Sequence, residues 1–235
     1  MITVLAVIPA RGGSKGIAQK NLRQVAGRPL LAYTADAART SRRITRAIVS
    51  TDDSAIAATA RELGLDVPFM RPDDLSDDVT PMLPVLQHAE REMSARGFVA
   101  DAILLLQPTS PLRRADHVDA AIDLLESSGA DTVVSVVEVP HQFNPVSVMR
   151  IEQDRLVPFI DGPLVLRRQD KPRVFARNGP AVLAVRTSVL QSGALYGHDV
   201  RPLLMTAEDS LDVDTVGDLE LAEYFLSRRL ASQTR

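Results

Sequence analysis

The sequence predicts an α/β fold: a mostly parallel sheet with helices on both faces and a small β-rich flap. Two observations support this prediction. Short apolar runs alternate with helical patterns along most of the chain, which is typical of repeated strand–helix units. The apolar runs are also continuous, as expected for parallel strands that are buried on both faces.

The predicted elements follow one another in a regular order. The first apolar run predicts a buried strand, a helical pattern follows it, and this order repeats as far as residue 137. Strands are expected over residues 3–8, 47–50, 67–70, 102–106, 132–137 and 181–185. Helices are expected over residues 29–40, 53–63, 81–96, 115–127 and 216–229.

The strand–helix order stops near residue 140. Residues 140–177 contain five prolines, scattered charges and no clear helical pattern. We interpret residues 140–178 as an excursion from the sheet that forms the flap. Residues 1–139 and 179–235 then make one α/β domain, which is large enough to bury a sizeable core.

Composition excludes several classes of protein. The net charge of −3 gives no electrostatic support for a nucleic-acid partner. The absence of cysteine excludes disulfides and thiolate chemistry, and it is compatible with a reducing compartment. No run is long enough to span a bilayer, and no basic segment precedes the first apolar run as in a signal peptide. We therefore expect a cytoplasmic protein with no membrane or nucleic-acid partner.

A glycine-rich loop, Pro-Ala-Arg-Gly-Gly-Ser-Lys-Gly over residues 9–16, follows the first predicted strand. Open α/β sheets bind ligands at the carboxyl ends of their strands. Glycine lets backbone N–H groups approach an anion there, and Arg11, Lys15 and Lys20 add cations that suit a triphosphate. The spacing fits neither the Walker loop nor the dinucleotide-binding fingerprint. The alternative interpretation is a solvated basic turn.

Two carboxylates stand close together near the end of the chain. Asp212 and Asp214 would point the same way on an extended segment, with Val213 directed into the core. Two carboxylates on one side form a hard oxygen site that suits Mg²⁺. We expect Asp214, which is nearer the last predicted helix, to be the more sensitive of the two. The alternative is that both are turn and helix-cap residues.

Several motifs occur together in a fixed order. After the first loop and Lys20-Asn21-Leu22 come Ser50-Thr51-Asp52-Asp53, the run from Leu105 to Arg113, Arg168-Gln169-Asp170-Lys171-Pro172, Asn178-Gly179 and the run from Asp209 to Thr215. This ordered set closely resembles the signature of the acylneuraminate cytidylyltransferases (CMP-sialic acid synthetases), and it covers nearly the whole chain. The related Kdo cytidylyltransferases share the fold but have a different first loop.

The resemblance implies a Rossmann-like nucleotidyltransferase fold, CTP and a nine-carbon 2-keto sugar acid as substrates, Mg²⁺, and a homodimer. It implies that residues 1–139 and 179–235 bind the nucleotide, and that the flap, residues 140–178, serves dimerisation. In relatives the flap crosses to the partner subunit and helps to close the sugar site. The implied reaction transfers CMP from CTP to the 2-hydroxyl of the sugar acid and releases pyrophosphate.

The resemblance also suggests a role for individual residues. We assign catalysis to Arg11, Lys20, Asp212 and Asp214, and the metal to Asp212 and Asp214. The nucleotide is assigned to Ala10, Arg11, Gly12, Lys15, Lys20, Asn21, Arg71 and Thr80. The sugar acid is assigned to Gln107 and Arg168.

Three of these assignments have a structural alternative. Gln107 could satisfy backbone groups in the turn after it, whereas Arg71 and Arg168 could be solvent-facing charges. The chain also departs from the family pattern: Val182 stands where many relatives carry a tyrosine, and a flap lysine has no match over residues 145–149. We therefore expect a more apolar sugar pocket, and legionaminic or pseudaminic acid rather than N-acetylneuraminic acid as substrate.

Two other functions stay open from the sequence. One is nucleotidyl transfer to another sugar acid or sugar phosphate of the Kdo type. The other is a non-catalytic nucleotide-binding module, which loss of the loop cations or of the acidic pair would favour. The sequence contains both the loop cations and the acidic pair.

Overall fold

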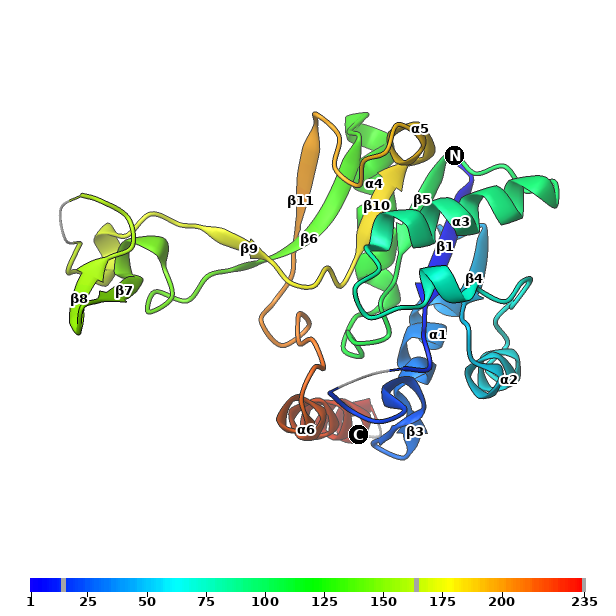
Figure 1. Ribbon diagram of the computed structural model, residues 1–235, viewed down its shortest axis with the longest axis horizontal. Coiled ribbons are helices and arrows are strands. Elements are labelled where there is room, and N and C mark those ends of the chain that lie inside the picture. Colours follow the sequence, from blue (N-terminus) through cyan, green and yellow to red (C-terminus); the bar gives the residue numbers. More distant parts are fainter. Residues whose placement is uncertain (14–15, 163–164, 234–235) are drawn as a thin grey trace.

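The computed structural model describes residues 1–13, 16–162 and 165–233. Its centre is a sheet in the order β11-β6-β10-β5-β1-β4 (Figure 1). β10 runs antiparallel to both of its neighbours, and the other pairs on this path are parallel. The prediction of a mostly parallel sheet is therefore confirmed. The strands are β1 (Val4–Pro9), β4 (Arg46–Ser50), β5 (Ala102–Leu105), β6 (Thr132–Glu138), β10 (Leu183–Arg186) and β11 (Val200–Leu204).

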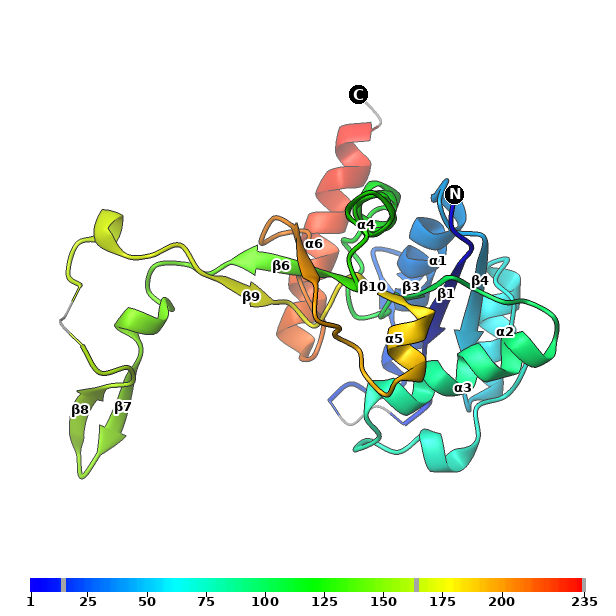
Figure 2. The same ribbon diagram turned by 90° about the horizontal axis from the view of Figure 1, so that it is seen from above.

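Helices cover both faces of the sheet, as predicted (Figure 2). Helices α1, α2 and α4 contribute to the apolar cluster on one face, and α3 and α5 pack on the other. The helices are α1 (Leu30–Thr40), α2 (Ser54–Glu62), α3 (Met82–Ala95), α4 (Ala115–Ser128), α5 (Thr187–Gln191) and α6 (Val216–Gln233). A short hairpin, β2 (Gln24–Val25) and β3 (Arg28–Pro29), precedes α1.

The pleat of β1 explains its continuous apolar sequence. Val4, Ala6 and Ile8 enter the cluster on one face, and Leu5 and Val7 enter the cluster on the other. Both sets are almost fully buried. Because successive side chains of a strand point to opposite faces, a strand covered on both sides needs an apolar residue at every position.

Several elements differ from the prediction, among them the β2–β3 hairpin, which it does not contain. Residues 67–70 form no strand: Asp66 makes a single bridge with Ile48, and Pro68 has no N–H to continue a ladder. Helix α5 and strand β11 are absent from the prediction. Helix α5 has only five residues, and β11 is a largely exposed edge strand that contains Pro202. Neither has the long periodic or continuous apolar pattern on which sequence prediction depends.

The flap is an arm that leaves the sheet after β6 and returns through β9 (Phe175–Arg177), which pairs with β6. Figures 1 and 2 both show the arm projecting away from the sheet. It carries the hairpin β7 (Met149–Glu152) and β8 (Arg155–Pro158). Buried Asn144 joins its two halves by donating from Nδ2 to the Pro172 carbonyl at 2.8 Å. Exposed apolar side chains on the arm include Phe143, Ile151, Leu156, Phe159, Ile160 and Leu166.

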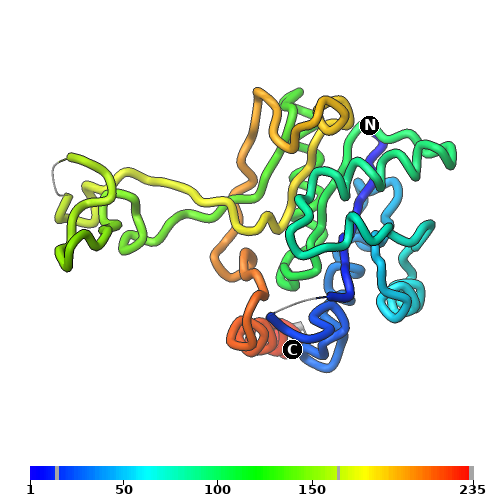
Figure 3. The backbone as a smooth tube through the Cα atoms, in the orientation of Figure 1, coloured from blue at the N-terminus to red at the C-terminus, as the bar shows by residue number. Residues whose placement is uncertain are grey.

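The last helix brings the end of the chain back to the first loop. The backbone trace shows α6 beside the segment that follows β1 (Figure 3). Leu219 and Ala222 of α6 share an apolar cluster with Ile17, Val25 and Val213.

Among the described residues, no helix is both long enough and apolar enough to cross a membrane.

A buried arginine holds the loop after β5. Arg113 is 3% exposed, and its guanidinium donates to the carbonyls of Gln107 at 3.0 Å and Ala181 at 2.7 Å. It also donates to the hydroxyl of Thr34. Burial lowers the pKa of Arg113 to about 9, so the side chain stays protonated at neutral pH. A charged donor shared by two carbonyls fixes the main chain that carries Gln107.

Candidate active site

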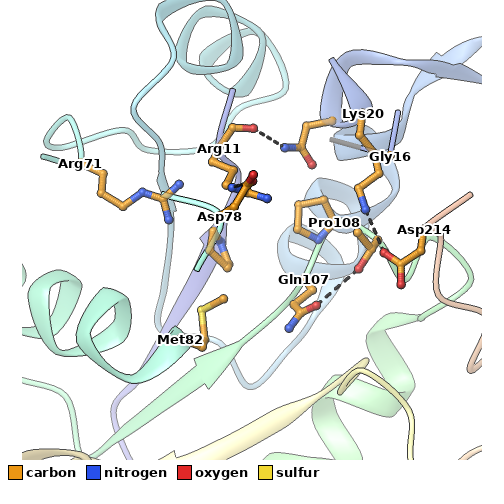
Figure 4. Close-up of a pocket in the computed structure, with 12 residues that line it drawn as sticks. Arg11, Gly16, Lys20, Arg71, Asp78, Met82, Gln107, Pro108 and Asp214 are labelled. Carbon is orange, nitrogen blue, oxygen red and sulfur yellow. Dashed lines mark hydrogen bonds and ion pairs between the residues drawn. The ribbon is translucent and has the colours of Figure 1, made fainter. Parts of the chain in front are cut away.

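A cavity of about 420 Å³ lies at the carboxyl ends of β1 and β5 (Figure 4). Parallel strands end at the same edge of a sheet, so loops that are distant in sequence meet there. The first loop, the segment after β5 and the segment before α6 all contribute to its wall. Predicted site residues in the wall are Arg11, Lys20, Asn21, Arg71, Gln107 and Asp214.

Short contacts fix the first loop at the edge of the cavity. Arg11 forms an ion pair with Asp78, and Nδ2 of buried Asn21 donates to the Arg11 carbonyl at 3.0 Å. Gly16 approaches the C-terminal segment closely: a Cβ at this position would lie only 2.7 Å from the carbonyl oxygen of Asp214. Glycine at position 16 is therefore required for the loop to reach Asp214.

Lys20 joins the first loop to the C-terminal segment. Its Nζ donates to the Val213 carbonyl at 2.8 Å and to Asp214 Oδ1 at 3.1 Å. The Lys20 side chain is 15% exposed, whereas that of Asp214 is 72% exposed. Figure 4 shows both side chains at the same wall of the cavity. The Lys20 ammonium group thus has little access to bulk water and lies beside the exposed carboxylate of Asp214.

Asp212 is the more buried of the two acidic residues. Burial raises its pKa, and the nearby charge of Asp214 adds to this effect, while a hydrogen bond from Thr109 opposes it. Asp212 Oδ1 is buried and has no hydrogen-bond partner among the described residues. Val213 is fully buried between the two carboxylates, as the alternation along an extended segment predicts. An unpaired buried carboxylate oxygen beside a second carboxylate is well suited to a cation.

Arg71 reaches the cavity from the segment after Asp66. It is 5% exposed, and burial lowers its pKa, which the charge of Asp52 partly opposes. Its Nη2 lies 3.5 Å from Asp52 Oδ1, and the same oxygen accepts from the backbone N–H of Gly12 at 3.2 Å. Asp52 therefore connects the buried guanidinium to the first loop.

Three further nucleotide assignments, Ala10, Gly12 and Thr80, are not among the described residues that line the cavity. Ala10 is fully buried beneath the loop, and the N–H of Gly12 is bonded to Asp52. Thr80 is half-buried, and its N–H donates to the Asp77 carbonyl at 3.2 Å. These three assignments stay predictions. Lys15 lies outside the described residues.

Gln107 presents its amide to the cavity. Its Nε2 donates to the Gly179 carbonyl at 3.1 Å, and its Oε1 accepts from the Thr109 hydroxyl at 3.4 Å. The backbone group that the side chain satisfies thus belongs to Gly179, and in the turn after Gln107 the amide meets only the hydroxyl of Thr109. The side chain also lines the cavity, so the assignment of Gln107 to the sugar acid stays a prediction.

Arg168 lies on the arm and not at the first cavity. It lines a second cavity, of about 530 Å³, together with His141, Lys171 and Arg173. Lys171 Nζ donates to the hydroxyl of Ser147 at 2.7 Å. Several cations thus gather on the arm, at a distance from the cavity that holds Arg11 and Lys20 of the same chain.

The expectation for Val182 is wrong. Val182 is fully buried in the core beside the sheet, and its backbone N–H donates to the Ser135 hydroxyl at 3.0 Å. A side chain in the core forms no wall of the sugar pocket. The valine therefore gives no evidence that this pocket is apolar.

Sequence reasoning missed four residues that build the site. Asp78 pairs with Arg11, Met82 lines the cavity, Asp52 joins Arg71 to Gly12, and Thr109 contacts both Gln107 and Asp212. Asp52 and Thr109 lie inside motifs that the sequence analysis identified. Asp78 and Met82 lie in an acidic stretch and at a helix start, and neither has a distinctive local pattern.

Known proteins share both the sequence pattern and the fold. Residues 5–172 match the family model described as cytidylyltransferase. The chain is 34% identical, over 94% of each chain, to CMP-N,N'-diacetyllegionaminic acid synthase of Legionella pneumophila. It is 30% identical to N-acylneuraminate cytidylyltransferase of Escherichia coli, over 93% of this chain and 51% of that protein.

Solved structures support the fold. The structure of CMP:2-keto-3-deoxy-manno-octonic acid synthetase complexed with CTP superposes with a TM-score of 0.72. The two chains are 18% identical, and the match covers 97% of this chain and 99% of the other. The predicted fold class is thereby confirmed.

Proposed function

This chain belongs to the cytidylyltransferase family, as its ordered motifs predict, and from this premise we propose that it activates a nine-carbon 2-keto sugar acid with CTP. CMP is transferred to the 2-hydroxyl of the acid, and pyrophosphate is released. Relatives named for reactions of this class support the proposal. The observation that carries it is the cavity that collects Arg11, Lys20 and Asp214 at the strand ends. A reaction that consumes CTP is expected in the cytoplasm.

The reaction is a displacement at the α-phosphate of CTP. The 2-hydroxyl oxygen forms a bond to phosphorus while the bond from phosphorus to the bridging oxygen breaks. Pyrophosphate leaves with the electron pair, and the hydroxyl proton passes to solvent. Arg11 and Lys20 neutralise charge on the phosphate oxygens, and Arg71 adds a third cation at the wall. Gln107 lies where its amide can orient the sugar acid.

The two carboxylates fit a magnesium ion. Asp212 offers a buried oxygen without a partner among the described residues, and Asp214 lies beside it. In the described part of the chain, no group of three or more His, Asp or Glu side chains gathers as a metal site. Mg²⁺ commonly binds through one or two carboxylates and keeps water and substrate phosphates as its other ligands. When bound, it would neutralise charge at the α-phosphate and lower the pKa of the attacking hydroxyl.

The sugar site is completed by the arm of a second copy of the chain. The arm exposes several large apolar side chains, which favours a protein partner for this surface. Arg168 lies on the same arm, away from the cavity of its own chain. In a homodimer each arm would carry its Arg168 to the other chain's Gln107, where the guanidinium can bind the substrate carboxylate through two hydrogen bonds.

Subunit complementation tests this arrangement. Arg168→Ala and Asp212→Asn should each be nearly inactive alone. In a hybrid dimer one of the two sites combines an intact arm with an intact core, because the defects lie on different chains. Co-expression with two affinity tags should therefore give about one quarter of the wild-type activity in the mixed population. A mixture as inactive as its parents would show that Arg168 acts within its own chain, and wild-type activity of Arg168→Ala alone would show that it has no role.

The choice of nucleotide is the first test of the function. We expect CTP to give far more pyrophosphate than ATP, GTP or UTP, because the glycine-rich first loop and the run from Leu105 to Arg113 match the cytidylyltransferases in order. The measurement is pyrophosphate release with each nucleotide, a nine-carbon acid and Mg²⁺. Equal rates with ATP or GTP would contradict the proposal.

The choice of sugar acid is a second test. We expect a higher kcat/KM with a legionaminic-type acid than with N-acetylneuraminic acid. This expectation is supported by the similarity to the Legionella protein over 94% of each chain and by the missing flap lysine. Val182 does not support it, because its side chain is buried in the core. An eight-carbon acid should react poorly. A higher kcat/KM for N-acetylneuraminic acid would contradict this part of the proposal and leave cytidylyl transfer intact.

A further inference from the structure

Gly179 lies at the root of the arm and touches two parts of the candidate active site. Its carbonyl accepts a hydrogen bond from Gln107 Nε2 at 3.1 Å. On its other side, a Cβ at this position would lie 2.9 Å from Asp212 Oδ2 and 3.3 Å from its carboxyl carbon. One main-chain position thus separates the amide assigned to the sugar acid from the carboxylate assigned to the metal.

We propose that Gly179 is a positioning residue, whose lack of a side chain leaves the Asp212 carboxylate oriented to bind Mg²⁺. The inference rests on the proposed function, because it assumes that Asp212 holds the metal. It adds a residue that would act on the metal through Asp212, without being a ligand itself.

The backbone around Asp212 is not free to move away from a larger residue at 179. The N–H of Val213 donates to the Thr109 carbonyl at 2.8 Å, and its carbonyl accepts from Lys20 Nζ at 2.8 Å. The Val213 side chain is fully buried among residues of α6 and the first loop. A shift of this segment would break both hydrogen bonds and disturb the core.

Residue 179 is equally restrained. Its φ is +100°, a conformation that glycine adopts readily and other residues rarely adopt. Pro180 follows, and a proline restricts the backbone of the residue before it. The hydrogen bond from Gln107 holds the carbonyl. With both backbones fixed, a methyl group at 179 would displace the Asp212 carboxylate, which can rotate about its side-chain bonds.

The chain offers a matched control for backbone strain. Gly193, which follows α5, has a φ of +91°, and a Cβ there would meet no atom within 4 Å. Gly179→Ala and Gly193→Ala both place a side chain at a positive φ, but only the first imposes a contact with Asp212. Both variants should lose a similar few degrees of Tm.

The decisive measurement is calorimetric titration of each variant with Mn²⁺, as a probe of the Mg²⁺ site, in the absence of substrates. We expect Gly179→Ala to bind Mn²⁺ about 10–100-fold more weakly than the wild type, the usual effect of disturbing a group that orients a ligand. Gly193→Ala should bind like the wild type. In assays, Gly179→Ala should need correspondingly more Mg²⁺, with an unchanged KM for CTP once Mg²⁺ is saturating.

The outcomes separate this inference from the function on which it rests. Wild-type Mn²⁺ affinity and Mg²⁺ dependence in Gly179→Ala would overturn the inference and leave the proposed function standing. A wild-type protein that neither binds Mn²⁺ nor transfers CMP would overturn the proposed function itself. If Gly179→Ala does not fold, Asp212→Ala is added to remove the carboxylate. The double variant should then fold with the stability of Gly193→Ala combined with Asp212→Ala, and failure to do so would overturn the proposed contact.

Discussion

Asp212→Asn is expected to lower kcat by about 10²–10³-fold, the effect of losing several kcal/mol of metal-based stabilisation. The amide keeps the shape of the side chain and removes the charge that would attract Mg²⁺. Asp212 is half-buried and its buried Oδ1 has no hydrogen-bond partner among the described residues, whereas the Asp214 side chain is 72% exposed and paired with Lys20. The structure therefore favours Asp212 as the more sensitive residue, the reverse of the order that the sequence suggests. The measurement is turnover against Mg²⁺ concentration for both Asn variants.

The same substitution should stabilise the protein without ligands. Burial raises the pKa of Asp212 in the folded state, so ionisation of this group disfavours folding. The cost is fully present above the folded-state pKa and disappears below the unfolded value of about 3.9. Asp212→Asn should thus have a Tm a few degrees above the wild type at pH 7–8, and the difference should shrink as the pH falls through the folded-state pKa.

Asp218 provides a control, because its ionisation stabilises the folded protein instead of destabilising it. Hydrogen bonds from the hydroxyl and backbone N–H of Thr215 lower the pKa of Asp218. Its stabilising effect is present above the unfolded pKa and is lost as the pH falls through the folded value. Asp218→Asn should therefore have a lower Tm than the wild type at neutral pH.

Wild-type turnover and Mg²⁺ dependence in both Asp212→Asn and Asp214→Asn would show that the metal is held elsewhere.

Lys20→Ala is the second change with a large expected effect. We expect kcat/KM for CTP to fall by about 10²–10³-fold, the usual effect of removing one group that stabilises transition-state charge. Lys20 also donates to the Val213 carbonyl and to Asp214, so its loss frees the segment that carries both acidic residues. Arg11→Ala should act in the same direction, because Arg11 lines the same cavity.

Arg23→Ala is the matched control for these variants. Arg23 is an exposed cation just after Lys20-Asn21-Leu22, and it is not part of the cavity wall. It should retain near-normal kcat/KM and Tm. If Lys20→Ala behaves like Arg23→Ala, the role assigned to Lys20 is wrong.

The sequence predicts those features that depend on local pattern. The buried strands, the long helices and the glycine-rich loop each have a signal within a few neighbouring residues. The alternation of Asp212, Val213 and Asp214 is equally local, and the burial of Val213 agrees with it. The exposed edge strand β11 and the five-residue α5 lack such signals, and residues 67–70 imitate a strand that Pro68 prevents.

The contacts that assemble the site depend on tertiary structure. Lys20 meets Val213 across 193 positions of sequence, and Gln107 meets Gly179 across 72. No pattern near either residue specifies its partner, because the sheet order and the packing of α6 bring them together. Val182 is a second case in which the sequence alone does not predict where a side chain lies. A residue can occupy a family position in sequence while its side chain is buried in the core.

The central claim is that this chain joins CMP to a nine-carbon 2-keto sugar acid. The most direct measurement is ³¹P NMR of the purified protein with CTP, Mg²⁺ and a legionaminic-type acid, with mass spectrometry of the product. We predict one new phosphodiester signal that grows in step with pyrophosphate, and a product mass equal to CMP plus the acid less water. Unchanged CTP with every nine-carbon acid tried, or release of CMP or pyrophosphate without a CMP–sugar product, would contradict the claim.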